Sequence, residues 1–127
     1  MRVLIVDDNP TNLKLASDVL VSEGFAVEAA EDATQAQAML TQRLPDLILM
    51  DIALPGMDGL ALTRLLKADS RFSKVPIVAL TASAMRGDEQ KALAAGCAGY
   101  ITKPINTREF ARQVRAFCSR GDQPVVG

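Results

Sequence analysis

The chain has 127 residues, of which 49% are apolar, enough for one globular domain with one hydrophobic core. Its 14 basic and 15 acidic residues leave a formal net charge of -1, which argues against binding to a nucleic-acid backbone or an anionic membrane surface. The sequence has no histidine and only two cysteines, without CxxC spacing, which argues against a zinc site, thioredoxin-type chemistry or an imidazole base.

Short β-branched runs alternate with longer segments in which apolar residues recur at helical spacing. The first helical segment carries Leu13, Ala16 and Leu20 on one face, and the last carries Phe110 and Val114. The five predicted strands are residues 2–6, 26–30, 47–50, 77–80 and 99–102. A helix is therefore expected between each strand and the next, and after the last one.

Residues that begin and end helices agree with these boundaries. Asn9 followed by Pro10 suits an N-cap and the first helical position. The other boundary residues are the capping-box pairs Asp32 with Gln35 and Asn106 with Glu109, and the helix-ending glycines Gly24 and Gly96.

The predicted strand over 47–50 is apolar at every position, as expected when helices cover both faces of a parallel sheet. The alternation of strands and helices then predicts a doubly wound α/β fold. We expect residues 1–119 to form this domain and residues 120–127, which lose the periodicity, to be a flexible tail or linker.

Polar residues stand where four of the predicted strands end. Asp7 and Asp8 follow the first strand, Asp51 follows the third, Thr81 ends the fourth and Lys103 follows the fifth. Since ligands of open α/β sheets bind at the carboxyl ends of the strands, these side chains are expected to converge. Three carboxylates in one crevice call for a cation, and their hard oxygens suit Mg²⁺. A lysine and a hydroxyl beside them suit a phosphoryl group.

The sequence resembles the receiver domains of response regulators, the CheY-like superfamily of bacterial two-component signalling. The resemblance covers almost the whole chain and rests on the segments VLIVDDNPTN, DLILMDIALPGMDGL, ALTA and YITKPI. It implies a flavodoxin-like (βα)5 fold with the strand order 2-1-3-4-5. It also implies a phosphorylation switch that acts on itself and does not turn over external substrates.

The resemblance assigns a role to each acidic residue. Asp51 would be the nucleophile that accepts a phosphoryl group from a phosphohistidine, carried by a sensor histidine kinase or a histidine phosphotransfer protein. Asp7, Asp8 and Asp51 would hold Mg²⁺, with the backbone carbonyl of Ala53 completing the protein ligands.

The same resemblance implies a switch around the phosphoryl group. Lys103 would pair with the phosphoryl oxygens, and the backbone amide of Ala82 would add a hydrogen bond. Thr81 would move toward the phosphoryl group and Tyr100 would swing inward, so that the face formed by the last two helices and the fifth strand changes shape for a protein partner.

Further features indicate the kind of receiver. The sequence KPIN after the fifth strand resembles single-domain regulators and receivers of hybrid sensor kinases more than those fused to DNA-binding domains. Cys97-Ala98-Gly99 stands where many dimeric receivers are acidic, so we expect a monomer or weak dimer. The apolar run over 3–6 is too short for a signal peptide or membrane span, which predicts a cytoplasmic protein.

Alternatives remain at this point. A small Mg²⁺-dependent phosphohydrolase would also use an aspartate nucleophile, although no DxD motif begins at Asp51. A nucleotide or flavin binder would share the fold, but no glycine-rich phosphate loop is present. Tyr100 also suits plain packing on a half-buried strand, and Lys103-Pro104 is either an ordinary strand exit or a cis peptide.

Overall fold

The computed structural model describes residues 1–52, 58–81, 88–103 and 105–122. Strands and helices alternate along the whole described chain. The strands are β1 (Arg2–Val6), β2 (Ala26–Ala30), β3 (Leu47–Asp51), β4 (Ile77–Thr81) and β5 (Gly99–Thr102). The helices are α1 (Pro10–Ser22), α2 (Ala33–Gln42), α3 (Gly59–Ala68), α4 (Asp88–Ala95) and α5 (Phe110–Asp122). The five strands predicted from the sequence are confirmed, and β3 and β4 each extend one residue further, to Asp51 and Thr81.

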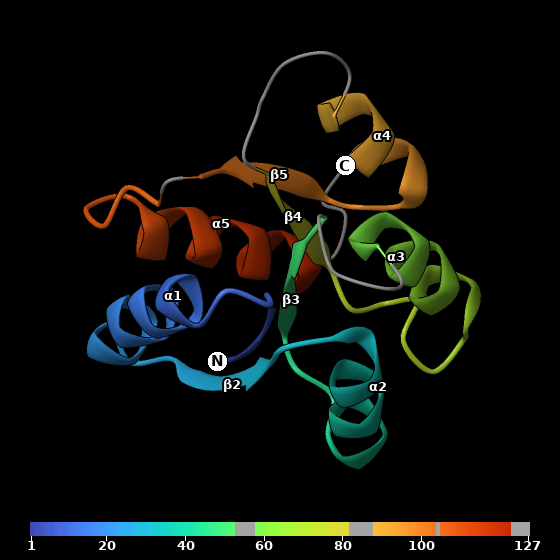
Figure 1. Ribbon diagram of the computed structural model, residues 1–127, viewed down its shortest axis with the longest axis horizontal. Coiled ribbons are helices and arrows are strands. Elements are labelled where there is room, and N and C mark those ends of the chain that lie inside the picture. Colours follow the sequence, from blue (N-terminus) through green and yellow to red (C-terminus); the bar gives the residue numbers. More distant parts are fainter. Residues whose placement is uncertain (53–57, 82–87, 104, 123–127) are drawn as a thin grey trace.

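The five strands form one parallel sheet in the order β2-β1-β3-β4-β5. Figure 1 shows α1 and α5 on one side of this sheet and α2, α3 and α4 on the other. The predicted doubly wound, flavodoxin-like architecture is therefore confirmed, with β3 at the centre of the sheet.

Each face of the sheet has its own hydrophobic core, because successive side chains of a strand point to opposite faces. In β1, Val3 and Ile5 pack with α1 and α5, whereas Leu4 and Val6 pack with α2, α3 and α4. All five residues of β3 are buried. This two-sided burial explains why the strand sequences are almost continuously apolar.

Local capping sets the helix boundaries. The Asn9 side chain accepts hydrogen bonds from Thr11 N at 2.9 Å and Asn12 N at 3.2 Å, as expected for the N-cap of α1. Gly24 and Gly96 have φ angles of 92° and 112°, the left-handed conformation that ends a helix at low cost for glycine. These predicted boundaries are confirmed.

The other two capping predictions have different outcomes. Asp32 caps α2 by accepting from Gln35 N at 2.8 Å, and Gln35 in return accepts from the backbone of Glu31 at 2.9 Å. Asn106 instead caps a turn: its side chain accepts from Arg108 N at 3.0 Å, and its backbone carbonyl accepts from Glu109 N. The regular part of α5 consequently begins only at Phe110.

The last helix runs further than the periodicity of the sequence indicates. It continues to Asp122, so residues 120–122 of the expected tail are helical, because a helix can propagate by backbone hydrogen bonds beyond its last buried side chain. Residues 123–127 lie outside the described residues. Within the described part of the chain, every helix falls short of the length and apolarity needed to span a bilayer.

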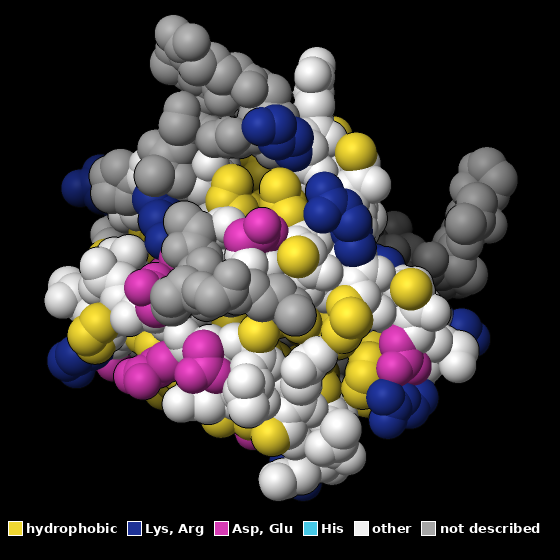
Figure 2. Space-filling view, turned by 45° about the vertical axis from the view of Figure 1, so that its right-hand side comes forward, with side chains coloured by type: hydrophobic (Ala, Val, Ile, Leu, Met, Phe, Trp, Pro, Cys, Tyr) yellow, Lys and Arg dark blue, Asp and Glu magenta, His cyan; other side chains and the backbone are white. Residues whose placement is uncertain are grey.

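The described surface carries charges of both signs. On the face shown in Figure 2, Lys and Arg side chains lie among Asp, Glu and apolar ones. This mixture agrees with the formal net charge of -1.

Candidate functional site

Sheet register brings the predicted site residues to one edge. Val6 pairs with Met50, so the residues that follow them, Asp7 and Asp51, emerge side by side at the carboxyl ends of β1 and β3. Asp7 N donates to Ala30 O at 3.0 Å, which ties the end of β1 to β2. The two carboxylates are thus set by neighbouring strands in the middle of the sheet.

Three carboxylates meet at this edge. One oxygen from each of Asp7, Asp8 and Asp51 lies within 4.8 Å of the others. Asp7 is 1% exposed and Asp51 is 4% exposed, whereas Asp8 faces solvent. The Asp7 side chain also accepts a hydrogen bond from Asn9 N at 2.9 Å, so the cap residue of α1 helps to orient it.

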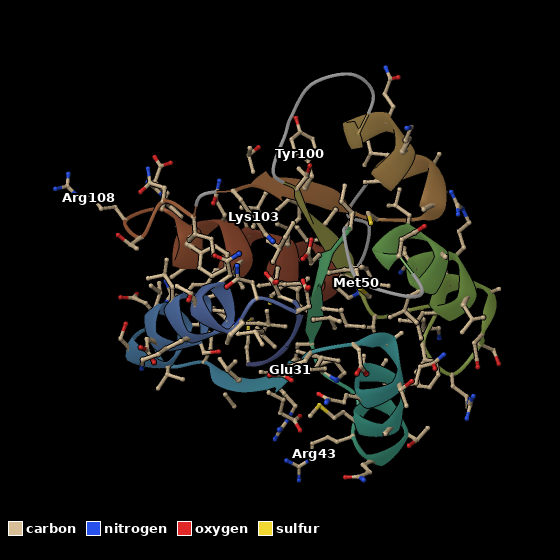
Figure 3. All side chains as sticks on the ribbon, viewed as in Figure 1. Glu31, Arg43, Met50, Tyr100, Lys103 and Arg108 are labelled. Atoms are coloured by element: carbon tan, nitrogen blue, oxygen red, sulfur yellow. The ribbon has the colours of Figure 1, made fainter. Side chains whose placement is uncertain are left out.

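One lysine crosses the edge to reach two of these carboxylates. The Lys103 ammonium lies 3.1 Å from Asp7 Oδ2 and 3.3 Å from Asp51 Oδ2. In Figure 3 the Lys103 side chain reaches from the end of β5 toward β3. Its backbone amide donates to Thr81 O at 2.7 Å, which holds it against the end of β4. A cation is therefore fixed beside two buried anions, where Coulomb attraction is stronger than in water.

The two residues expected to switch lie on adjacent strands. Thr81 is 2% exposed at the end of β4, and its strand pairs with both β3 and β5. Tyr100 is half-buried on β5 and packs against the core on the α2, α3 and α4 side of the sheet. The other predicted contributors, Ala53 and Ala82, lie outside the described residues, as does Pro104.

The donor set fits a hard divalent cation. Three carboxylates in one crevice repel each other, and Mg²⁺ prefers oxygen ligands of this kind. Lys103 supplies one positive charge against the three carboxylates, so the described groups leave the cluster with an excess of acidic groups. The cluster therefore favours binding of a cation.

One buried polar residue was missed by the sequence analysis. Thr63, on α3, is completely buried and donates a hydrogen bond from its hydroxyl to Gly59 O at 2.8 Å. The sequence did carry a signal for it, because Thr63 lies one helical turn after Gly59 on the apolar face of the helix, where a hydroxyl needs a partner.

Comparison with known proteins agrees with the fold and the site. The sequence matches the family model of the response regulator receiver domain over residues 3–115. It is 38% identical over 115 residues to the polar-differentiation response regulator DivK of Brucella anthropi, covering 91% of this chain and 94% of DivK.

Solved structures give the same result. A putative response regulator from Chloroflexus aurantiacus superposes with a TM-score of 0.89 at 29% identity, covering 94% of this chain and 98% of the other. The receiver domain of a sensor histidine kinase from Pseudomonas aeruginosa, with magnesium coordinated in its active site cleft, gives a TM-score of 0.84 at 36% identity, covering 93% and 97%.

Fold and site together define a doubly wound α/β domain with a cluster of three carboxylates at the carboxyl edge of its sheet. The chain belongs to the response regulator receiver domain family and is DivK-like. Receiver domains are switches of two-component systems: histidine kinases phosphorylate them, they bind Mg²⁺ at an acidic pocket, and they act on partner proteins.

Proposed function

We propose that this chain is a phosphorelay receiver in which Asp51 accepts the phosphoryl group from the phosphohistidine of a sensor histidine kinase or a histidine phosphotransfer protein. The observation that carries the proposal is the position of the Lys103 ammonium, 3.3 Å from Asp51 and 3.1 Å from Asp7 inside the acidic cluster. A transferred phosphoryl group needs a nucleophile, a metal site and a fixed cation together, and this edge has groups for all three.

Asp51 is the best placed nucleophile of the three acids. It ends the central strand, between β1 and β4, and lies beside both the lysine and the strand that carries Thr81. Asp7 has one oxygen engaged by Asn9 N and the other by Lys103, which suits a fixed metal ligand. Asp8 faces solvent at the rim of the crevice.

The chemistry is an in-line displacement at phosphorus. A carboxylate oxygen of Asp51 forms the new bond to phosphorus while the bond to the donor imidazole nitrogen breaks, and the imidazole leaves with the electron pair. Mg²⁺ held by Asp7, Asp8 and Asp51, with the carbonyl of Ala53, would neutralise charge on the phosphoryl oxygens. Lys103 donates to a phosphoryl oxygen, and the amide of Ala82 adds a second hydrogen bond.

Output follows from charge added at Asp51. Thr81 moves its hydroxyl toward the phosphoryl group, Tyr100 turns inward, and the face formed by α4, β5 and α5 changes its affinity for a protein partner. The half-buried position of Tyr100 on β5 supports this, since the ring already contacts the core beside that face.

The same proposal includes the kind of protein that carries the domain, its location and its oligomeric state. Residues 1–119 act as the receiver of a single-domain regulator or a hybrid sensor kinase, in the cytoplasm, as a monomer or weak dimer. The likeness to DivK and to the receiver of a sensor kinase supports both architectures.

Labelling with a small phosphodonor tests the assignment. Wild-type protein incubated with radiolabelled acetyl phosphate and Mg²⁺ should incorporate label, and Asp51→Asn should incorporate none while keeping its circular dichroism spectrum. Asp18→Asn, which removes an exposed carboxylate on α1, is the matched control and should label as wild type. Undiminished labelling of Asp51→Asn would contradict the proposal.

A second assay separates the switch from an enzyme. With a phosphate ester as substrate, a receiver that takes its phosphoryl group from phosphohistidine or acetyl phosphate should release little phosphate. Release far in excess of protein would instead favour the phosphohydrolase alternative.

A further inference from the structure

Thr63 has an unusual position among the buried polar groups. In the described residues, the buried polar or charged side chains are Asp7, Asp51, Thr63 and Thr81. Three of these four belong to the carboxyl edge of the sheet, and the fourth, Thr63, lies on α3 with no exposed surface. A hydroxyl in an apolar core costs free energy unless it is hydrogen-bonded, so its partners show what it holds in place.

One partner leads directly to Asp51. The Thr63 hydroxyl donates to Gly59 O at 2.8 Å, and Gly59 N in turn donates to Ile52 O at 3.3 Å. Gly59 packs so closely on β3 that a Cβ added to it would collide with the backbone carbonyl of Asp51. The first turn of α3 therefore rests on the backbone of the residue proposed to carry the phosphoryl group.

The other partner lies on a different element. Cys97, in the connection from α4 to β5, is buried, and the neighbouring Thr63 side chain acts to lower the pKa of its thiol. Burial raises the pKa of the Cys97 thiol, so the thiol is protonated at neutral pH. The Thr63 side chain thus lies between the first turn of α3 and the turn that leads into β5.

A second contact, one helical turn further on, fixes the same connection. The Lys67 ammonium donates to Ser73 O at 3.0 Å and Val75 O at 2.8 Å, which lays its side chain across the end of α3. A Cβ at Gly96 would come within 2.8 Å of Lys67 Cγ, so the turn before Cys97 packs on this side chain. Figure 1 shows α3 and α4 next to each other, in agreement with this contact.

We propose that Thr63 is a positioning residue for phosphorylation, which holds the backbone of Asp51 through Gly59 and couples it to the Cys97 turn that leads into β5. The proposal rests on the proposed function of Asp51. A hydroxyl bonded to the carbonyl four residues earlier is by itself a common feature inside helices. Here the acceptor residue is Gly59, which packs on the backbone of Asp51, and the Thr63 side chain also lies beside Cys97 on another element. Loss of the hydroxyl should therefore lower the rate of phosphorylation of Asp51.

Three threonine variants test this with one readout. We expect Thr63→Val, which keeps the shape, to label from acetyl phosphate at least about fivefold more slowly, because a slightly misplaced reacting group loses up to ~100-fold in rate. Thr63→Ser restores the hydroxyl and should recover most of the rate. Thr41→Val is the matched control, since Thr41 donates to Ala38 O at 2.7 Å at an exposed position of α2, which contributes no residue to the site.

The outcomes are distinguishable. If wild type itself takes up no label, the proposed function is wrong, and so is the positioning role of Thr63 that depends on it. If wild type labels and Thr63→Val labels within about twofold of it, or Thr63→Ser is as slow as Thr63→Val, the positioning role alone is wrong.

If Thr63→Val does not fold, the coupling can still be tested in protein that keeps Thr63, by measuring the rate at which a thiol reagent modifies Cys97. In a Cys118→Ala background, Cys97 is the one thiol left in the sequence. Coupling between two sites is reciprocal, so beryllofluoride with Mg²⁺ should change the rate of Cys97 modification by a thiol reagent at least about threefold. An unchanged rate, with beryllofluoride binding shown by fluorine NMR, would overturn the coupling.

Discussion

The Lys103 ammonium lies 3.1 Å from the Oδ2 atom of Asp7, a carboxylate that is 1% exposed. Lys103 also contacts Asp51, so a single cation faces two buried anions. Removing one partner of a buried ion pair is costly because the remaining charge stays desolvated. Lys103 is therefore expected to matter for folding when no metal is bound, as well as for phosphoryl chemistry.

Lys103→Met should lower the free energy of unfolding by about 1–3 kcal/mol in the absence of divalent cations, because its 17% exposed side chain leaves two carboxylates without their cation. Mg²⁺ should recover part of this loss. Urea unfolding with and without Mg²⁺ measures both effects. Lys14→Met, which removes an exposed pair with Asp18, is the control and should change little. Equal losses in the two variants would contradict the prediction.

Asp8→Asn should separate metal binding from stability. Asp8 faces solvent and adds negative charge to the cluster, so its loss should leave the metal-free protein equally or more stable. The same change removes a ligand oxygen charge and should weaken Mg²⁺ binding by roughly tenfold or more. Isothermal titration with Mg²⁺ and thermal unfolding of the metal-free protein give the two readouts. Unchanged Mg²⁺ affinity in the variant would show that Asp8 is not a ligand.

Local sequence signals predicted what local physics determines. The strand ends at Asp7, Asp51 and Lys103 could be placed because a polar residue interrupts each apolar run, and parallel strands put their carboxyl ends at one edge. The helix starts at Asn9 and Asp32 followed from side-chain capping within three residues.

Contacts between distant segments could not be predicted in this way. The links from Thr63 to Cys97 and from Lys67 to Gly96 depend on how α3 packs against the connection from α4 to β5, which no local pattern encodes. The extension of α5 to Asp122 likewise leaves no periodic apolar signal in the sequence, because a helix can propagate by backbone hydrogen bonds beyond its last buried side chain.

Stability at alkaline pH should depend on Cys97. Burial raises the pKa of this thiol above its ordinary value of 9.0 and outweighs the hydrogen bond from Thr63 and the Lys67 charge, which both lower it. Below pH 9.0 the thiol is protonated in both the folded and the unfolded chain, so the contribution of Cys97 to stability is fully present. As the pH rises past it, the unfolded chain ionises first, so folding is progressively disfavoured up to the folded-state pKa.

Cys97→Ala tests this contribution. Urea unfolding from about pH 8 to about pH 10 should show a steeper loss of stability in wild type than in the variant. The difference between the two curves reports the thiol together with its charge interaction with Lys67, since Lys67, whose pKa is lowered by burial and raised by Cys97, contributes with the opposite sign. Parallel curves would mean that the thiol titrates alike in the folded and unfolded chain.

The packing of β5 on α5 should depend on the absence of a side chain at Gly99. A Cβ there would come within 2.5 Å of the Phe117 ring, while Gly99 also pairs with Val78 in the sheet and cannot move freely. Gly99→Ala should therefore cost about 1–3 kcal/mol of stability through overpacking. Phe117→Leu removes the atoms that collide, so the double variant should be more stable than the sum of the single changes predicts.

A double-mutant cycle by urea unfolding measures this coupling. Gly24→Ala is the matched control: a Cβ there meets nothing within 4 Å, and its cost comes from the φ of 92°. That cost should therefore be the same with Phe117 or with leucine at the position. Additive effects of Gly99→Ala and Phe117→Leu would show that β5 and α5 shift apart easily. Strong coupling would show instead that β5 and α5 cannot shift apart to relieve the collision.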